Sequence, residues 1–252
     1  MTTLLADMSM VRPYPATASE ISPKTGRGFF PGRMGVAGQS GLPRRPVMVV
    51  GQDFDEYESW KKTPAGDETG ATWDELLKVL REAGIALESC FFTNVLMGVR
   101  IVQVQPGKEP SNSGPSPALD DAAFVGRCLE FLGRQIEVMR PSVVVLLGAP
   151  AACVVATWLG LHPFRRPGVK ASTWLAGWKE IDAAGLQWVR GVRSPRGDGV
   201  ELSVACAIHP ALRKSNLRHR SWAARGLAGE AADREIWKEV AREFERLRGV
   251  EG

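Results

Sequence analysis

The stretch SVVVLLGAPAACVVATWLG, from Ser142 to Gly160, decides the fold class. Its first half is a run of branched apolar residues that ends at Gly148, which is typical of a strand buried on both faces of a parallel sheet. Its second half is rich in alanine and predicts a helix that follows the strand directly. A buried strand that leads at once into a helix is the repeating unit of parallel α/β sheets.

The same succession recurs on both sides of this stretch. VMVV (Val47 to Val50) and SCFFTNV (Ser89 to Val95) predict two more buried strands, and Leu186 to Ile208 predicts a hairpin or two linked strands. Helices are expected from a T-x-x-E capping box at Thr72 to a stop at Gly84, from about Leu119 to Arg140, and from Gly229 to Arg248. This order predicts a three-layer αβα sandwich around a central, mainly parallel four-stranded sheet.

The composition bounds the class of protein. A chain of 252 residues, 44% hydrophobic and 24% charged, can bury a proper core. It has no apolar run long enough to span a bilayer and no secretory leader, so we expect a soluble intracellular protein. Residues 1–45, rich in Pro, Gly, Ser and Thr, predict an irregular surface arm, and residues 46–252 a single α/β domain.

Charge and cysteine usage add two further expectations. The net charge is +4 and arginine predominates among the cations, which favours an anionic partner because the guanidinium group binds phosphate well. The cysteines stand singly in apolar segments without a C-x-x-C pair, so we interpret them as reduced core residues and expect no metal, iron–sulfur cluster or other cofactor. They are Cys90, Cys128, Cys153 and Cys206.

Polar residues follow the predicted strands where they end. Gln52 and Asp53 come after the first strand, Asn94 ends the second, and His209 follows the last. Ligands of open α/β sheets bind at the carboxyl ends of the strands, so these side chains should converge on one crevice. An acid, an amide and an imidazole together suit chemistry on a polar planar molecule.

Four motifs in this order resemble those of the uracil-DNA glycosylase superfamily: VVGQDFD, FFTNVLMGVR, RPSVVVLLGAPAA and AIHPALRKSN. The resemblance covers roughly Val47 to Arg220. It implies an enzyme that flips uracil out of DNA and hydrolyses its N-glycosidic bond, leaving an abasic site in base excision repair. It further implies a monomer of the bacterial cytoplasm, associated with the nucleoid, that acts on single- or double-stranded DNA without a membrane or an obligate protein partner.

The resemblance also assigns roles. Asp53 would orient the attacking water and stabilise the sugar cation, while His209 would hydrogen-bond uracil O2 as charge builds on the departing base. The Asn94 amide can accept from N3–H and donate to O4 of uracil, a pair that cytosine presents reversed. The backbone N–H of Gln52 would be a further donor to the base.

Two roles in the expected uracil pocket remain unassigned. Asp55 stands where the best-known branch has a tyrosine that excludes the thymine methyl group, so it could block the pocket or signal altered substrate choice. The aromatic residue that stacks on uracil has no clean match, and Tyr57, Trp60 and Trp73 all compete for the role.

Contacts with DNA are expected from two segments. In HPALRKSN, either Leu212 or Arg213 would wedge into the duplex, and Lys214 would contact phosphate. The Pro- and Ser-rich loop from Gln105 to Pro117 offers the further phosphate contacts Lys108, Ser111 and Ser113.

Simpler interpretations remain beside these. An aspartate after a strand is most often a turn or cap residue, and a basic loop is most often only solvated. Phe54 and Asp55 alter the water-activating motif, so a protein that binds uracil-containing DNA with little turnover is a second hypothesis. A nucleoside or nucleotide N-glycoside hydrolase and a structural domain of a repair complex are the others.

Overall fold

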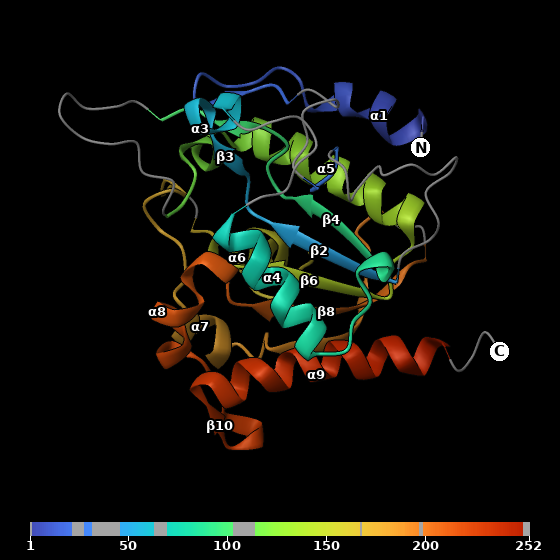
Figure 1. Ribbon diagram of the computed structural model, residues 1–252. Helices are drawn as coiled ribbons and strands as arrows, with labels where there is room; N and C mark the ends of the chain where they lie inside the picture. The colour runs from blue at the N-terminus through green and yellow to red at the C-terminus, as the bar shows by residue number, and fades with distance from the viewer. Residues whose placement is uncertain are drawn as a thin grey trace.

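The computed structural model describes residues 2–21, 28–31, 46–62, 70–102, 114–166, 168–196 and 199–248. Its centre is a five-stranded sheet in the order β4-β2-β6-β8-β7 (Figure 1). The strands are β4 (Cys90–Asn94), β2 (Val47–Gly51), β6 (Val143–Leu147), β8 (Glu201–Ala207) and β7 (Trp188–Arg193).

The first four strands of this order are parallel, which confirms the mainly parallel sheet. The sheet has one strand more than predicted, because β7 pairs antiparallel with β8 at the edge. The apolar segment from Leu186 to Ile208 is therefore the hairpin that its turn-rich middle suggested. Among the described residues β7 pairs on one side, with β8, and much of the strand is exposed, as an edge strand can be.

Helices cover both faces of the sheet, which confirms the three layers. Because successive side chains of a strand point to opposite faces, Met48 and Val50 join one core and Val47 and Val49 join the other. The first core lies under α5 (Ala122–Met139) and α6 (Ala149–Trp158), and the second under α4 (Ala71–Glu82) and α9 (Gly229–Arg248). In Figure 1, α4 crosses the near face and α9 runs along the lower edge.

Helix ends differ from the sequence prediction in two places. Helix α4 begins at Ala71 with Gly70 as its N-cap, so Thr72 lies inside the helix instead of capping it. The helix expected from Leu119 is divided: a 3₁₀ turn, η4 (Pro117–Asp120), precedes α5 because the carboxylate of Asp121 accepts a hydrogen bond from the N–H of Phe124 at 2.8 Å and caps the helix. The stop at Gly84 and the bounds of α9 are as predicted.

Shorter elements surround this frame. A second sheet has the order β1-β5-β3, and a two-stranded sheet pairs β9 with β10. Their bounds are β1 (Ala18–Ser19), β5 (Val99–Arg100), β3 (Phe54–Glu56), β9 (Ser221–Trp222) and β10 (Leu227–Ala228). The short helices are α1 (Thr2–Asp7), α3 (Tyr57–Lys62), α7 (Trp178–Ala183) and α8 (Arg213–Asn216). The remaining 3₁₀ turns are η1 (Met8–Val11), η3 (Leu87–Ser89), η5 (Pro210–Leu212), η6 (Leu217–His219) and η7 (Ala223–Arg225).

The described parts of residues 1–45 contain regular structure, although their composition predicts an irregular arm. Leu4 and Val11 are fully buried in the core shared with α5, and strand β1 pairs with β5. Phe30 packs against Phe91 and Phe131, and its N–H donates to the carbonyl of Phe92 at 2.7 Å. A few apolar residues widely spaced in the segment are enough to fix these parts on the domain.

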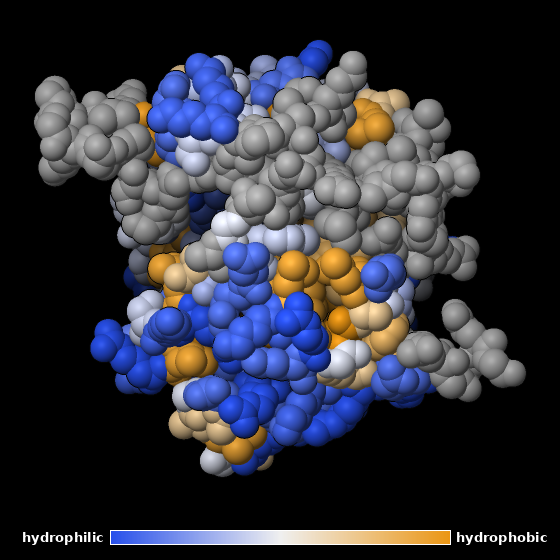
Figure 2. All heavy atoms as spheres, in the orientation of Figure 1, coloured by the Kyte–Doolittle hydropathy of each residue, from blue (hydrophilic) through white to orange (hydrophobic). Residues whose placement is uncertain are grey.

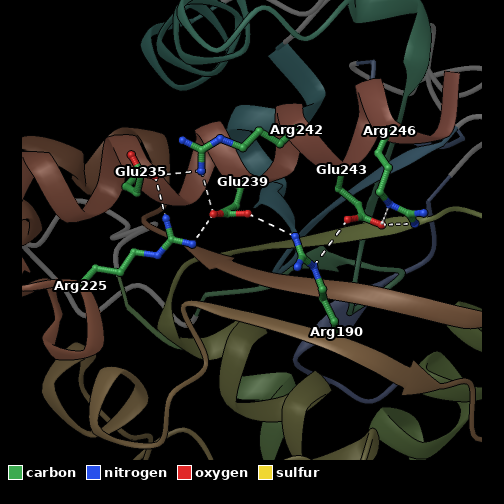
Figure 3. A network of polar contacts seen from close by, with 7 residues as sticks. All are labelled: Arg190, Arg225, Glu235, Glu239, Arg242, Glu243 and Arg246. Carbon is green, nitrogen blue, oxygen red and sulfur yellow. Dashed lines mark hydrogen bonds and ion pairs between the residues drawn. The ribbon is translucent and has the colours of Figure 1, made fainter. Parts of the chain in front are cut away.

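An ion-pair network holds α9 against the edge of the sheet (Figure 3). Glu239 and Glu243, both about 5% exposed, face Arg190 of β7 from consecutive turns of the helix. Arg225, Arg242 and Arg246 complete the network around them. In Figure 2 the surface over α9 is accordingly hydrophilic. Within the described ranges, no helix combines the length and apolar character that crossing a lipid bilayer requires.

Candidate functional site

The carboxyl ends of the parallel strands form one edge, and the polar residues predicted from the sequence lie along it. Gly51 of β2 is the register partner of Asn94 of β4. On the other side of β2, the N–H of Gly148 after β6 donates to the carbonyl of Ala207 at the end of β8. Asp53 and His209 follow β2 and β8 by two residues each, so the fold brings the acid, the amide and the imidazole to the same edge of the sheet.

Asp53 is held by a forked ion pair. The Nε–H of Arg100 donates to Oδ2 of Asp53 at 2.9 Å, and the Nη2–H donates to Oδ1 at 3.2 Å. The two side chains are only 5% and 11% exposed, in that order. Sequence reasoning did not single out Arg100, although the residue lies inside the motif FFTNVLMGVR, because nothing in the strand pattern shows which way its side chain turns.

Gln52 and Gly114 tie this pair to the start of the segment before α5. The side-chain amide of Gln52 donates to Oδ1 of Asp53 at 3.2 Å and to the carbonyl of Gly114 at 3.3 Å. Arg100 donates to the same carbonyl at 3.2 Å. The acid is therefore fixed by two neighbours that are themselves anchored to a third segment of the chain.

Asn94 is buried, and its amide lies against a glycine. A Cβ added at Gly51 would come within 2.3 Å of Oδ1 of Asn94 and 3.4 Å of Cε1 of Phe29. Only a residue without a side chain leaves the amide in this position. The N–H groups of Val95 and Leu96 donate to the carbonyls of Gly51 and Gln52, which holds the exit of β4 over the exit of β2.

His209 lies over the second glycine of the edge. Gly148 has a φ of +89°, and a Cβ built there would come within 3.2 Å of the Cβ of His209. Burial lowers the pKa of His209, while the negative charge of Asp53 acts in the opposite direction. The imidazole is thus neutral at neutral pH, and the electrostatic influence of Asp53 on it is consistent with both groups facing one site.

An aromatic residue that sequence reasoning missed lies beside Gly51, on which the Asn94 amide also rests. The partly buried ring of Phe29 packs against Phe92 and Trp73, beside Gly51. Of the three predicted candidates, Trp73 is buried in the core under α4, Trp60 packs edge-on against Phe54, and Tyr57 lies under the ammonium group of Lys61. Phe29 gave no signal in the sequence because its neighbours have no strand or helix periodicity.

In the loop after His209, two of the predicted DNA contacts are exposed to solvent and a third is paired within the protein. Leu212 is 40% exposed and is one of two large hydrophobic residues that the described part of the chain exposes to this extent. Lys214 is also exposed. Arg213 instead donates to Asp233 of α9 and to Glu75 of α4, both at 3.0 Å. Its guanidinium group fastens the loop to two helices.

A second arginine, Arg220, anchors the C-terminal end of the same loop. The side chain of Arg220 is fully buried, stacks on Trp178 at 4.3 Å and pairs with Asp182 at 3.3 Å. It also donates to the carbonyl of Cys206 in β8 at 2.9 Å. Burial lowers the pKa of Arg220 and raises that of Asp182, in each case against the pull of the partner's charge. The segment from His209 to Arg220 is therefore fixed at its far end.

The remaining predicted site residues cannot be placed. Lys108, Ser111 and Ser113 lie outside the described residues. Asp55 belongs to β3, but its side chain is also outside what the structure describes.

The cysteines do not fit an iron–sulfur cluster, which needs several thiolates gathered together. All four are buried, in β4, α5, α6 and β8. Burial raises the pKa of Cys128, Cys153 and Cys206 to about 12, which keeps these thiols protonated. In the described part of the chain, no three His, Cys, Asp or Glu side chains form a group that could hold a metal ion.

The family model of the uracil DNA glycosylase superfamily matches residues 39–239 of this sequence. The chain belongs to this superfamily. The match includes all four motifs that suggested the resemblance and extends over the five-stranded sheet, so the expectation of family and fold is confirmed.

Two curated relatives are similar over part of their length. A type-4 uracil-DNA glycosylase of Thermotoga maritima is 35% identical over 116 residues, which are 46% of this chain and 51% of the relative. A type-4 uracil-DNA glycosylase of Archaeoglobus fulgidus is 31% identical over 112 residues, 44% of this chain and 48% of the relative. The chain thus spans about half the length of the curated relatives it matches.

The pH dependence of stability should report the burial of His209. Its pKa in the folded protein lies below the ordinary 6.5, so the unfolded chain binds the proton more readily. This contribution to stability is present above about pH 6.5 and is lost as the pH falls toward the lower folded value. In urea unfolding between about pH 8 and 5, the wild type should lose more stability toward acid than His209→Gln does, and parallel curves would contradict the proposed burial.

The role of Arg213 as a fastener can be tested against its neighbour. Arg213→Ala should lower the free energy of unfolding by about 3 kcal/mol, because it leaves the buried Asp233 without its partner. Lys214→Ala, one residue further and exposed, should change it by less than about 0.5 kcal/mol. Chemical denaturation of both variants measures the difference, and equal small effects would show that the Arg213 pairs contribute nothing to stability.

Proposed function

We propose that this protein is a uracil-DNA glycosylase that flips uracil out of DNA and hydrolyses its N-glycosidic bond. The product would be an abasic site, the intermediate of base excision repair. The observation that carries the proposal is the gathering of Asp53, Asn94 and His209 at one sheet edge in a chain of this superfamily. The names of the two type-4 relatives support it.

The chemistry suits the two groups that would face the bond. Cleavage passes through a sugar with cationic character and a base that departs with negative charge. The carboxylate of Asp53 would orient water toward the sugar. His209, whose lowered pKa keeps it neutral, would donate a hydrogen bond from its ring N–H to uracil O2 without itself carrying a positive charge.

Recognition of uracil would fall to Asn94 and Phe29. A buried amide that must pair its acceptor and donors discriminates strongly between uracil and cytosine, because the wrong base leaves these groups unpaired. Phe29 lies beside that amide and offers a ring on which a planar base could stack. We therefore favour Phe29 over Tyr57, Trp60 and Trp73 as the stacking residue.

DNA would be engaged through the loop after His209. An exposed apolar side chain suits insertion into the space of a flipped base, so we favour Leu212 as the wedge, with Lys214 as a phosphate contact. Arg213 is already paired with two carboxylates, which argues against it. With DNA as its substrate, the protein would work beside the chromosome in the cytoplasm.

One observation favours the second hypothesis of a protein that binds uracil-containing DNA with little turnover. The ion pair with Arg100 partly neutralises the charge that Asp53 could offer to a sugar cation. Binding without excision is therefore the alternative that an experiment must separate from catalysis.

Excision from a labelled oligonucleotide with a single uracil decides between them. The wild type should release uracil, so that later treatment with alkali cuts the strand at that position, while a thymine-containing control stays intact. Asp53→Asn should slow excision by about 10² to 10⁴-fold, because it loses the group that orients water.

Three other outcomes of this experiment would each contradict a different part of the proposal. Strand cutting that is equal in the wild type and Asp53→Asn would remove Asp53 from the mechanism. No cutting by either protein, together with retention of uracil-containing DNA in a gel-shift assay, would establish the binding hypothesis. Release of uracil from free deoxyuridine alone would point to a nucleoside hydrolase.

Substitution of the aromatic residues tests which ring stacks on the base. Phe29→Leu should lower kcat/KM on the uracil oligonucleotide by about tenfold or more, because stacking of a base on an aromatic ring contributes about 1–3 kcal/mol. Trp174→Leu, a tryptophan of another region stacked under Arg166, serves as the control. A larger loss in Tyr57→Leu or Trp60→Leu than in Phe29→Leu would assign the platform to α3 instead.

A further inference from the structure

We propose that Arg100 is a positioning residue that fixes the carboxylate of Asp53 so that a single acceptor site, on Oδ2, is left for the attacking water. This inference rests on the proposed function and names a residue to which none of the predicted roles was given. It follows from the donors around Asp53 and from the way the chain holds Arg100.

The donors around Asp53 occupy most of its hydrogen-bonding capacity. An ionised carboxylate has about four acceptor sites, two on each oxygen. Within the described ranges, Oδ1 accepts from Nη2 of Arg100 and from the amide of Gln52, both at 3.2 Å. Oδ2 accepts from Nε of Arg100 at 2.9 Å. Three sites are then filled, and the fourth belongs to Oδ2.

The fork also fixes the plane of the carboxylate. Two parallel N–H donors of one guanidinium group hold both oxygens at once, which a single point charge cannot do. The acid therefore cannot turn about its own side chain without breaking both bonds. A carboxylate prepared in this way presents its remaining lone pair in one direction before the substrate arrives.

Arg100, which positions Asp53, is itself held in place by strand pairing and a further hydrogen bond. It lies in β5, the middle strand of the sheet β1-β5-β3, where its register partners are Ala18 and Glu56. Its Nη2 also donates to the carbonyl of Gly114. The N-terminal segment, through β1, thus supports the residue that supports the acid.

Burial argues that the pair persists through the reaction. Separating a buried ion pair leaves an uncompensated charge away from water, which is strongly unfavourable. If Arg100 inhibited Asp53, the ion pair would have to break at every turnover, and this cost would recur each time. A permanent contact avoids this cost, so we infer positioning and not inhibition.

Single-turnover excision with enzyme in excess isolates the chemical step. Arg100→Gln should lower this rate constant about 10²-fold, the usual effect of a small misplacement of a catalytic group. Its Kd for uracil-containing DNA should stay within about twofold of the wild type, because the lost interaction acts on the reaction and not on binding. Arg100→Lys keeps the charge without the fork and should lie between Arg100→Gln and the wild type.

A double-mutant cycle shows whether Arg100 acts through Asp53. In the Asp53→Asn background, Arg100→Gln should cause no further loss, because residues that act as one unit are not additive. Arg127→Gln is the matched control: Arg127 is another arginine that contacts the N-terminal segment, where it donates to the carbonyls of Val11 and Pro13. This variant should keep the wild-type single-turnover rate.

The inference is overturned by any of three results. These are an unchanged or increased rate in Arg100→Gln, a loss that appears in Kd, or a loss that adds to that of Asp53→Asn. If Arg100→Gln does not fold, Arg100→Lys decides, since a wild-type rate in it would exclude a need for the fork. A wild type without Asp53-dependent excision would refute the proposed function itself, whereas an active wild type with an indifferent Arg100 refutes only this inference.

Discussion

The hydrogen-bond ladder between β2 and β4 sets Gly51 opposite Asn94, and the candidate site depends on that pairing. Because side chains alternate along a strand, a slip of one residue would turn the Asn94 amide to the other face of the sheet. The same register lets the amide rest against a residue without a side chain, with Phe29 beside it. Asp53 follows Gly51 by two residues, so the acid and the amide are placed by one set of backbone contacts.

Three arginines with largely buried side chains organise the site and the loop after His209. Arg100, Arg213 and Arg220 each pair with a carboxylate that is largely withdrawn from water: Asp53, Asp233 and Asp182, respectively. The first holds the acid, and the other two hold the loop after His209. Part of the arginine excess that suggested an anionic partner is thus used inside the protein. Composition alone cannot separate these two uses, because it does not show which guanidinium groups face solvent.

Sequence reasoning succeeded where one strand or helix carries its own signal. The apolar runs that became β2, β4 and β6 and the whole of α9 were found with nearly their true bounds, and the strand ends predicted which polar residues lie along one edge of the sheet. It failed where distant segments decide the outcome. Nothing near Phe29 indicates that it lies beside Gly51, and nothing near Arg100 indicates that it turns toward Asp53. The regular parts of residues 1–45 were missed for the same reason, since Leu4 and Val11 gain their burial from α5.

The small sheet β1-β5-β3 ties the first twenty residues to the candidate site. A fragment that begins at β2 would keep all four motifs of the superfamily. It would lose β1, which pairs with β5, the strand that carries Arg100. Its backbone at β5 would then face water on one side, and the guanidinium group next to the acid would become less well ordered. Such a shortened protein would also lack Phe29 and the buried Leu4, Val11 and Phe30, so the boundaries chosen for expression would alter both its stability and its measured activity.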